Sequence, residues 1–458
     1  EYSFLYKVVT EKIIKIRIMK KVIGVALICF LIKTGVSAQV KYNLQLCIDT
    51  ALVNNIAVQQ SGLLTDAAKV NLKQARANLL PNLNAGLDHG VQTGRSIDPY
   101  TNTYADQSVR YAGYGASSGV VLFNGMNLQN NIKQNRYAYN ASAMELQQDK
   151  DNLTLNVILA YLLVLNNEDQ LSSAKNQKAL SLRQLERLQI MDSMGAVSPS
   201  QVSDLKGQTM NDELTILNLN NQLETSKLAL AQLMNVPYST EMSLERMDAD
   251  EFLTADSRSP GEIFGTALKQ FPLVRSVELR KQSAKFALRS ARGALYPTLS
   301  LSGNAQTNYS SSAQNATGKI AYNQQVKNNV FTTVNLGMTI PIFNYFRAKN
   351  NIKLAAINYR NTELIEKDTK NKLHQQIEQA HLNMTSAYES YKTLLQQVDA
   401  YVISFKAAEI RFASGVGTSV DYLTAKNNLD RSNINLISSK YDFVLRKKVL
   451  DYYQNEIK

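Results

Sequence analysis

Short stretches of the chain alternate strictly between apolar and polar residues, a period of two that is typical of β-strands. Residues 297–309 place Leu299 and Leu301 on one face and Ser300 and Ser302 on the other. Comparable alternation predicts further strands near 81–91, 109–123 and 328–343. Strands of about ten residues with one apolar face suit a soluble hairpin and a membrane β-barrel equally well.

Two much longer segments, residues 127–194 and 345–414, contain neither glycine nor proline. At ~1.5 Å per residue, each predicts a helix on the order of 100 Å long, far beyond the usual length in globular proteins. Their apolar residues are interspersed with Gln, Asn and Lys. Such helices need neighbours of the coiled-coil kind, and one side of the assembly stays in contact with water.

Each long segment ends at a glycine and is followed by a second helical segment. Gly415 suits the positive φ of a helix C-terminus. Thr418 with Asp421 then has the spacing of a capping box for the next helix, and Ser198 with Gln201 has the same spacing in the first half. The sequence therefore predicts two helical hairpins, over 126–235 and 345–457.

The chain is an internal duplication. Pro81 recurs as Pro297 at an offset of 216 positions, and Gly195 recurs as Gly415 at an offset of 220. Collinear matches over most of the chain define a first repeat at 39–236 and a second at 260–458. In each, a helix of about 35 residues, predicted over 43–80 or 260–295, precedes two strands and a helical hairpin. The acidic segment 237–259 joins the repeats, as an equatorial linker or as a flexible one.

Residues 1–38 have the features of an export leader. Lys20 and Lys21 precede an apolar run, and the small residues Val36-Ser37-Ala38 follow it, which predicts secretory cleavage after Ala38 and a start at Met19. The formal charge of +12 is inflated by this leader and otherwise spread along the helices, so no nucleic-acid partner is expected. Cys47 remains the single cysteine of the mature chain, which excludes an intrachain disulfide.

The sequence offers no constellation for catalysis or for a cofactor. His374 and His381 share a helix face, but two histidines are too few ligands for a stable metal site, and His89 stands alone. Phosphate-binding glycine loops, Ser-His-Asp sets and Cys/His clusters are missing from the sequence. We therefore expect neither an enzyme nor a bound metal or cofactor.

Two strands followed by a long helical hairpin, repeated twice on an exported chain, resemble the TolC family of outer membrane efflux channels. The resemblance covers residues 40–458. It rests on GVGTSVDYLTA at 415–425 and its partner at 195–205, and on the segments ARANLLPNL and ARGALYPTL before the strands. It implies a mainly α fold with a small membrane β part. Three chains would share a twelve-stranded barrel, continued by a helical barrel across the periplasm.

The resemblance also implies roles for the hairpin tips. In that family the tips close the tunnel like an iris and meet a periplasmic adaptor, which docks an inner-membrane pump. Asp421 lies where family members place an acidic ring, and a ring of three carboxylates would favour cations. Asp421 also suits the role of a helix cap, and the two roles are compatible.

Several tip positions depart from the family pattern. Thr424 stands at the usual second acidic position, Gly417 where an arginine can tether the closed state, and Phe412 where a tyrosine is frequent. Asp204 adds charge near the first tip. The expected adaptor contacts are Gly195, Ala196, Val197, Gly415, Val416 and Gly417.

These features predict a passive homotrimeric channel in the outer membrane, the exit duct of a tripartite efflux or type I secretion system. The alternative is a periplasmic coiled-coil scaffold or adaptor without a pore. The alternating strands, flanked by aromatic residues at expected membrane interfaces, favour the channel. Those aromatic residues are Tyr111, Tyr114, Phe123, Phe331 and Phe343.

Overall fold

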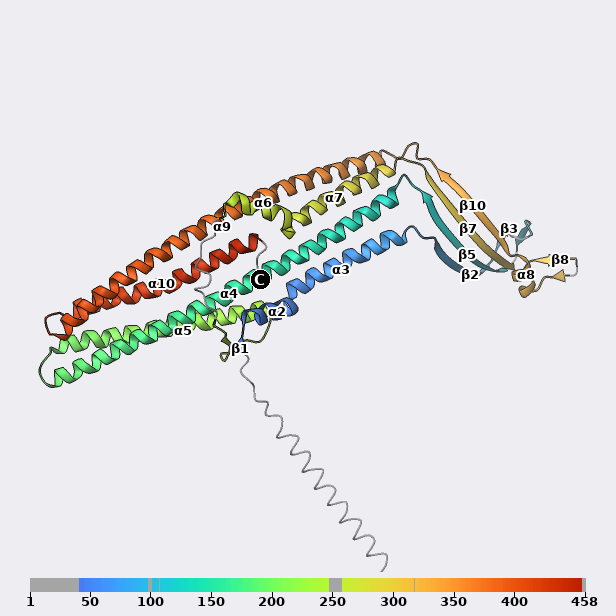
Figure 1. The fold of residues 1–458 in the computed structure, drawn as a ribbon. Coiled ribbons are helices and arrows are strands. Elements are labelled where there is room, and N and C mark those ends of the chain that lie inside the picture. Colours follow the sequence, from blue (N-terminus) through green and yellow to red (C-terminus); the bar gives the residue numbers. More distant parts are fainter. Residues whose placement is uncertain (1–40, 98–100, 107, 247–257, 317, 455–458) are drawn as a thin grey trace, which may run out of the picture.

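The computed structural model describes residues 41–97, 101–106, 108–246, 258–316 and 318–454. The leader predicted over 1–38 and residues 247–257 of the joining segment lie outside these ranges. The molecule is elongated, with a curved sheet at one end and helices running to two tips at the other (Figure 1). Among the described residues, no helix combines the length and the apolar character that crossing a bilayer requires.

The sheet has four antiparallel strands in the order β10-β7-β5-β2. The two predicted hairpins therefore lie side by side, joined through β5 and β7, and the alternating segments form strands as expected. The bounds are β2 (Asn82–Gln92), β5 (Val109–Phe123), β7 (Thr298–Ser310) and β10 (Phe331–Thr339). Short pairs lie at the far end of the strands: β3 (Arg95–Ile97) with β4 (Tyr104–Asp106), and β8 (Gln314–Asn315) with β9 (Gly318–Lys319).

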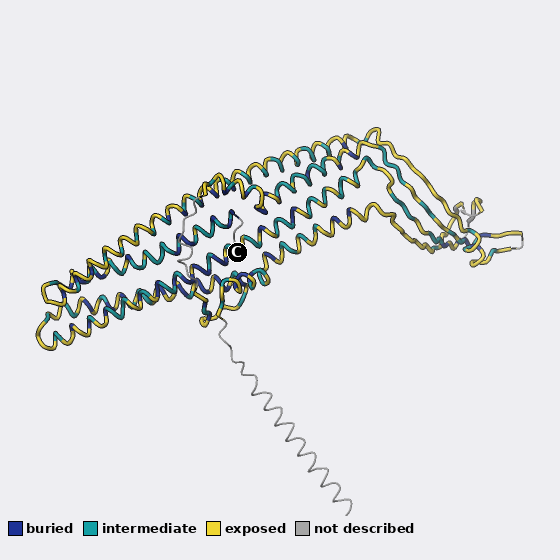
Figure 2. The backbone as a smooth tube through the Cα atoms, in the orientation of Figure 1, coloured by how far each residue is buried: buried dark blue, intermediate teal, exposed yellow. Residues whose placement is uncertain are grey.

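The register gives the sheet one apolar and one polar face. Leu301 pairs with Leu336 and with Val120, and Leu87 pairs with Tyr114, so these side chains share a face. The opposite face carries mainly Asn, Gln, Ser, Thr and Gly. The outer strands β2 and β10 are exposed along nearly their whole length, and β5 and β7 are partly exposed (Figure 2). A single chain therefore leaves an apolar sheet face in contact with solvent.

The helices continue the order of the strands. Pairwise packing joins α3 (Ile56–Ala77), α4 (Asn127–Ser193), α7 (Pro272–Gly293) and α9 (Arg347–Ala413) in one layer. Two shorter helices, α5 (Pro199–Met234) and α10 (Ser419–Tyr453), return from the tips and pack on α4 and α9. The long helices and the two hairpins have the predicted positions.

The helix predicted ahead of each strand pair was wrong in one respect, because each is broken in two. The first is α2 (Leu44–Asn54) followed by α3, and the second is α6 (Pro260–Gln270) followed by α7. The Asn55 side chain accepts hydrogen bonds from Ala57 N and Val58 N, at 3.0 and 3.3 Å, and so caps a new helix. Pro272 stands at the first position of α7, where its missing N–H is tolerated.

The core lies midway along the helices. Cys47, Tyr161, Leu162 and Leu230 are buried in a cluster that α2, α4 and α5 share with the joining segment. β1 (Lys41–Tyr42) pairs in parallel with β6 (Ser243–Leu244), and the Tyr161 hydroxyl donates to Glu245 O at 2.5 Å. The described part of 237–259 therefore packs against the helices. A last helix, α8 (Tyr322–Asn328), packs on β7 through the buried Gln325.

Candidate channel wall and tip gate

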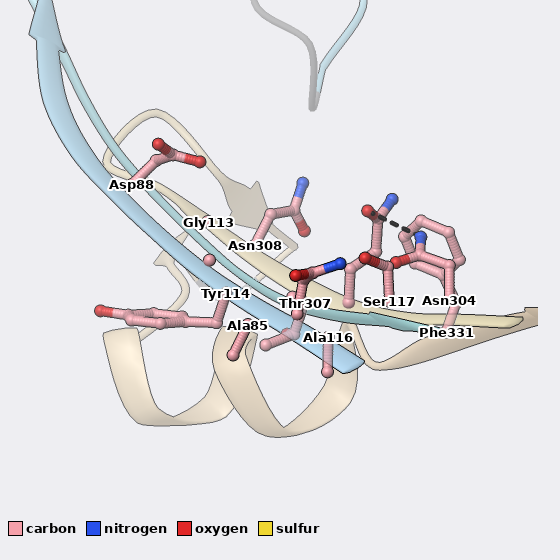
Figure 3. Close-up of a pocket in the computed structure, with 14 residues that line it drawn as sticks. Ala85, Asp88, Gly113, Tyr114, Ala116, Ser117, Asn304, Thr307, Asn308 and Phe331 are labelled. Carbon is pink, nitrogen blue, oxygen red and sulfur yellow. Dashed lines mark hydrogen bonds between the residues drawn. The ribbon is translucent and has the colours of Figure 1, made fainter. Parts of the chain in front are cut away.

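The polar face of the sheet is concave between β2, β5, β7 and β10. It holds a pocket of about 460 Å³ lined by residues such as Asp88, Asn304 and Asn308. Figure 3 shows Asn304, Asn308 and Asp88 on one side of the sheet, and Tyr114, Thr307 and Ala85 on the other. Asn304 Nδ2 donates to Gln306 Oε1 at 3.1 Å, so the amides bond to each other along the strand. Such a surface suits the wall of a water-filled duct.

Both tips are built by the same backbone device. Gly195 and Gly415 have φ values of +72° and +77°, as predicted for Gly415. Ala196 N donates to Met191 O at 2.9 Å, and Val416 N donates to Arg411 O at 3.0 Å. These are Schellman motifs, in which glycine reverses the chain at low conformational cost. Val416 is 80% exposed at the end of the molecule, where a partner can reach it.

The second hairpin forms the predicted capping box. Thr418 Oγ1 accepts from Asp421 N at 3.1 Å, and Asp421 Oδ2 accepts from Thr418 N at 3.4 Å and from Thr418 Oγ1 at 2.8 Å. These bonds from Thr418, with the nearby Arg411 charge, hold the pKa of Asp421 below its ordinary value. Asp421 is exposed and therefore remains a carboxylate at neutral pH.

The first hairpin lacks the corresponding box, and that prediction was wrong. Ser198 precedes α5 in extended conformation, but its side chain makes no capping bond. Pro199 occupies the first helical position, where it fixes φ and removes one of the N–H groups that need a partner. The two tips therefore share their glycine turns and differ in how the following helix begins.

Phe412 is an anchor of the tip core. Its ring is 9% exposed and stacks on Tyr422 at 5.0 Å, among Leu185, Leu188 and Leu205 of the first hairpin. Residues of both hairpins thus share one apolar cluster. Burial, with nearby carboxylates, raises the pKa of Tyr422 to about 12, and its buried hydroxyl has no partner among the described residues.

The three other tip residues that the sequence analysis named differ in their surroundings. Thr424 is exposed one turn after Asp421, so it lies on the same helix face. Asp204 is exposed, and its Oδ2 accepts a hydrogen bond from Ser419 Oγ at 2.8 Å, which links α5 to α10. At Gly417 a Cβ would come within 3.1 Å of Phe412 N and 3.2 Å of Arg411 C, so a larger side chain requires the turn to shift.

A buried ion cluster continues this link between the hairpins, and sequence reasoning missed it. Lys426 is 1% exposed; its Nζ donates to Asp430 and lies 3.4 Å from Asp212 Oδ2 of α5. Ser181 Oγ of α4 donates to the same Asp212 oxygen at 2.5 Å. Burial raises the pKa of Asp430, and Lys426 opposes this rise. The sequence does contain a pattern that could have predicted this cluster. A spacing of four residues places Tyr422, Lys426 and Asp430 on one face of a helix.

The histidines and cysteine have structural surroundings. His374 meets Phe264 edge-on at 4.6 Å, and its Nδ1 lies 3.6 Å from Glu378 Oε2. Within the described ranges, no group of three or more His, Cys, Asp or Glu residues is arranged to hold a metal ion. Cys47 is fully buried, and burial raises the pKa of its thiol to about 12.

A sheet with one apolar face, continued by long helical hairpins, defines a class of membrane channel that spans a bilayer and the space beneath it. The outer membrane efflux protein family model matches residues 47–236 and 263–450, one segment in each repeat. The chain belongs to this family. It is an outer membrane efflux channel with its helical part in the periplasm.

Known proteins agree with this assignment. The chain is 24% identical to the outer membrane protein TolC of Escherichia coli over 415 residues, 88% of this chain and 80% of that one. Its fold is similar to the outer membrane protein VceC of Vibrio cholerae, with a TM-score of 0.77, 15% identity and coverage of 90% and 95%. It is also similar to the open state of the MtrE channel of Neisseria gonorrhoeae, with a TM-score of 0.74, 18% identity and coverage of 91% and 89%.

Proposed function

We propose that three copies of this chain close one twelve-stranded barrel and one helical tunnel, and that this trimer is the passive exit duct of a tripartite efflux or type I secretion system. The observation that carries the proposal is the four-stranded sheet with an apolar and a polar face. Its outer strands, β2 and β10, have no further strand beside them among the described residues. Four strands are too few to close a barrel.

Joining copies edge to edge solves two problems at once. It pairs the free N–H and C=O groups of β2 and β10, which is a requirement inside a bilayer. It also places Leu87, Val334 and Leu336 toward lipid, where their exposed fractions of 78%, 75% and 66% are favourable. The polar face with Asn304 and Asn308 then lines the duct.

The tips would form the regulated end of the duct. Three Asp421 carboxylates around the axis would attract cations, and Thr424 on the same face would line the constriction. The exposed tip residues around Gly195 and Gly415 would contact a periplasmic adaptor protein, which links the duct to an inner-membrane pump. The segment 237–259 would encircle the middle of the helical barrel, since its described part already packs there.

Edge pairing is testable by disulfide cross-linking. Leu87→Cys in β2 is combined, one at a time, with Thr332→Cys, Val334→Cys or Leu336→Cys in β10, which are positions on the same sheet face. We expect the pair in register to give a covalent trimer on oxidation. Leu87→Cys with Thr333→Cys is the matched control, because Thr333 faces the other side. Failure of every same-face pair to cross-link contradicts the shared barrel.

A further inference from the structure

The helix segments next to the sheet carry basic residues without acidic ones. Lys and Arg occur, and Asp and Glu do not, in four segments: 67–80, 124–144, 282–297 and 341–359. They lie at the sheet ends of α3, α4, α7 and α9, so all four meet where helices and strands join (Figure 1). We call the Lys and Arg side chains of these segments the basic collar.

The collar charges face solvent without carboxylate partners. Arg76, Arg136, Arg289 and Lys353 are exposed, and no collar residue forms an ion pair among the described residues. The pattern changes farther from the sheet on the same helices. Arg280 pairs with Glu145 at 2.7 Å, Lys281 with Glu366 at 2.5 Å, and Lys370 with Glu278 at 2.9 Å. Uncompensated positive charge is therefore concentrated at the sheet end.

Aromatic rings gather some of these charges. Phe286 stacks on Tyr137 with 5.4 Å between ring centres. Lys133 Nζ and the Arg289 guanidinium lie 5.5 and 5.1 Å from the centre of the Phe286 ring, and Arg136 lies 5.7 Å from that of Tyr137. Three cations thus surround two stacked rings. Their mutual repulsion falls when an anion binds among them.

The sheet side of the collar is an exposed apolar belt. This apolar belt consists of Leu80 (68% exposed), Ile342 (95%), Phe343 (67%), Tyr345 (81%) and Phe346 (59%). Aromatic residues of this kind occupy the interface between membrane and water. From the sheet toward the tips, the order is the apolar strand face, the apolar belt and the basic collar. The same order holds in a bilayer for hydrocarbon, interface and headgroup phosphates.

We propose that the basic collar binds the phosphate groups of acidic phospholipids in the leaflet that faces the periplasm. The inference rests on the placement of the sheet in the membrane, and it adds a lipid specificity to the channel. It fixes the depth of the trimer by charge as well as by apolar burial. A collar that lines the duct and attracts anionic cargo is the competing outcome.

The absence of tryptophan from the chain allows a clean test. Phe343→Trp places one fluorescent reporter in the apolar belt of each chain. The full-length trimer is reconstituted in phosphatidylethanolamine vesicles that contain either brominated phosphatidylglycerol or brominated phosphatidylethanolamine as quencher. We expect phosphatidylglycerol to be preferred by about three-fold or more, and the preference to weaken as salt screens the charges.

The variant Lys133→Gln/Arg136→Gln/Arg289→Gln should bring the two lipids close to equal quenching. The control variant is Lys206→Gln/Lys392→Gln/Lys406→Gln, which removes three exposed cations far from the membrane. It should retain the preference for phosphatidylglycerol.

Equal quenching before any collar change overturns the proposal, and so does an unchanged preference in the collar variant. A collar variant that alters only the ion selectivity of single channels assigns the collar to the duct. Absence of quenching by either lipid shows that the sheet lies outside the bilayer, which refutes the channel itself.

Discussion

At the scale of single residues, the contact between the two hairpins depends on Lys426. This side chain is almost fully buried and neutralises carboxylates from two helices, Asp212 of α5 and Asp430 of α10. Removing one partner of a buried ion pair leaves the other charge uncompensated, which is far worse than losing a surface pair. The ammonium group therefore holds the tip of one hairpin against the other.

Lys426→Met should destabilise the tips by about 3–5 kcal/mol, because the buried Asp212 and the half-buried Asp430 would both lose their cation. The measurement is amide hydrogen exchange in the tip halves of α5 and α10. Lys206→Met is the control, since Lys206 is the equivalent position of the first repeat and is exposed. It should change exchange little, by about 0.5 kcal/mol or less. Equal effects of the two substitutions would show that the buried pair is unimportant.

At the scale of elements, the duplication predicts where helices begin and end but not how each end is stabilised. The paired glycines fixed both hairpin turns, since only a residue tolerant of positive φ suits a Schellman motif. The spacing of Ser198 and Gln201 predicted a box that does not form, because Pro199 already starts the helix. The break at Asn55 was missed, since an Asn inside a helical pattern signals a cap only when its side chain turns back to the backbone.

Thr418→Ala should cost about 1 kcal/mol of local stability at the start of α10, whereas Ser198→Ala should leave α5 nearly unchanged. The reason is that only Thr418 donates and accepts capping bonds. Hydrogen exchange of the first turn of each helix measures both. Comparable losses at the two sites would contradict the structural difference between the tips.

Because Asp421 is part of the capping box, the stability of the first turn of α10 should depend on pH, and the direction follows from the pKa of Asp421. The pKa of Asp421 is lower in the folded chain than in the unfolded one, where an aspartate has a pKa of ~3.9. The cap is therefore fully effective above that pH and is lost as the pH falls through the lowered folded value. The protection of amides in the first turn of α10, taken relative to their intrinsic exchange rate at each pH, should therefore fall on acidification, and Asp421→Asn should remove this pH dependence.

At the scale of the whole molecule, sequence alternation was sufficient to assign the two sheet faces. It could not assign the strand order, because pairing of β5 with β7 joins residues about 200 positions apart and depends on the assembled layer. The buried cluster around Lys426 was hidden for the same reason: Asp212 approaches only when both hairpins are in place. Long-range geometry therefore limits what the repeats reveal.

Neighbouring residues on β10 test the assignment of the faces. Leu336→Lys should reduce the amount of trimer assembled in the outer membrane, because a lysine at the lipid face costs about 2–4 kcal/mol near the bilayer centre. Asn335→Lys, one residue away and on the polar face, should assemble normally. Semi-native electrophoresis of membrane fractions measures both. Normal assembly of Leu336→Lys together with loss of Asn335→Lys would reverse the faces.

The central claim is that the trimer forms a passive pore whose narrow end lies at the tips. Single-channel recording of the purified protein in a planar bilayer, with Asp421→Ala alongside, tests it most directly. We expect a steady conductance with a cation preference that weakens in Asp421→Ala. A pore with the same ion preference in both proteins would leave Asp421 as a helix cap only. A protein that stays soluble without detergent and gives no conductance would contradict the channel.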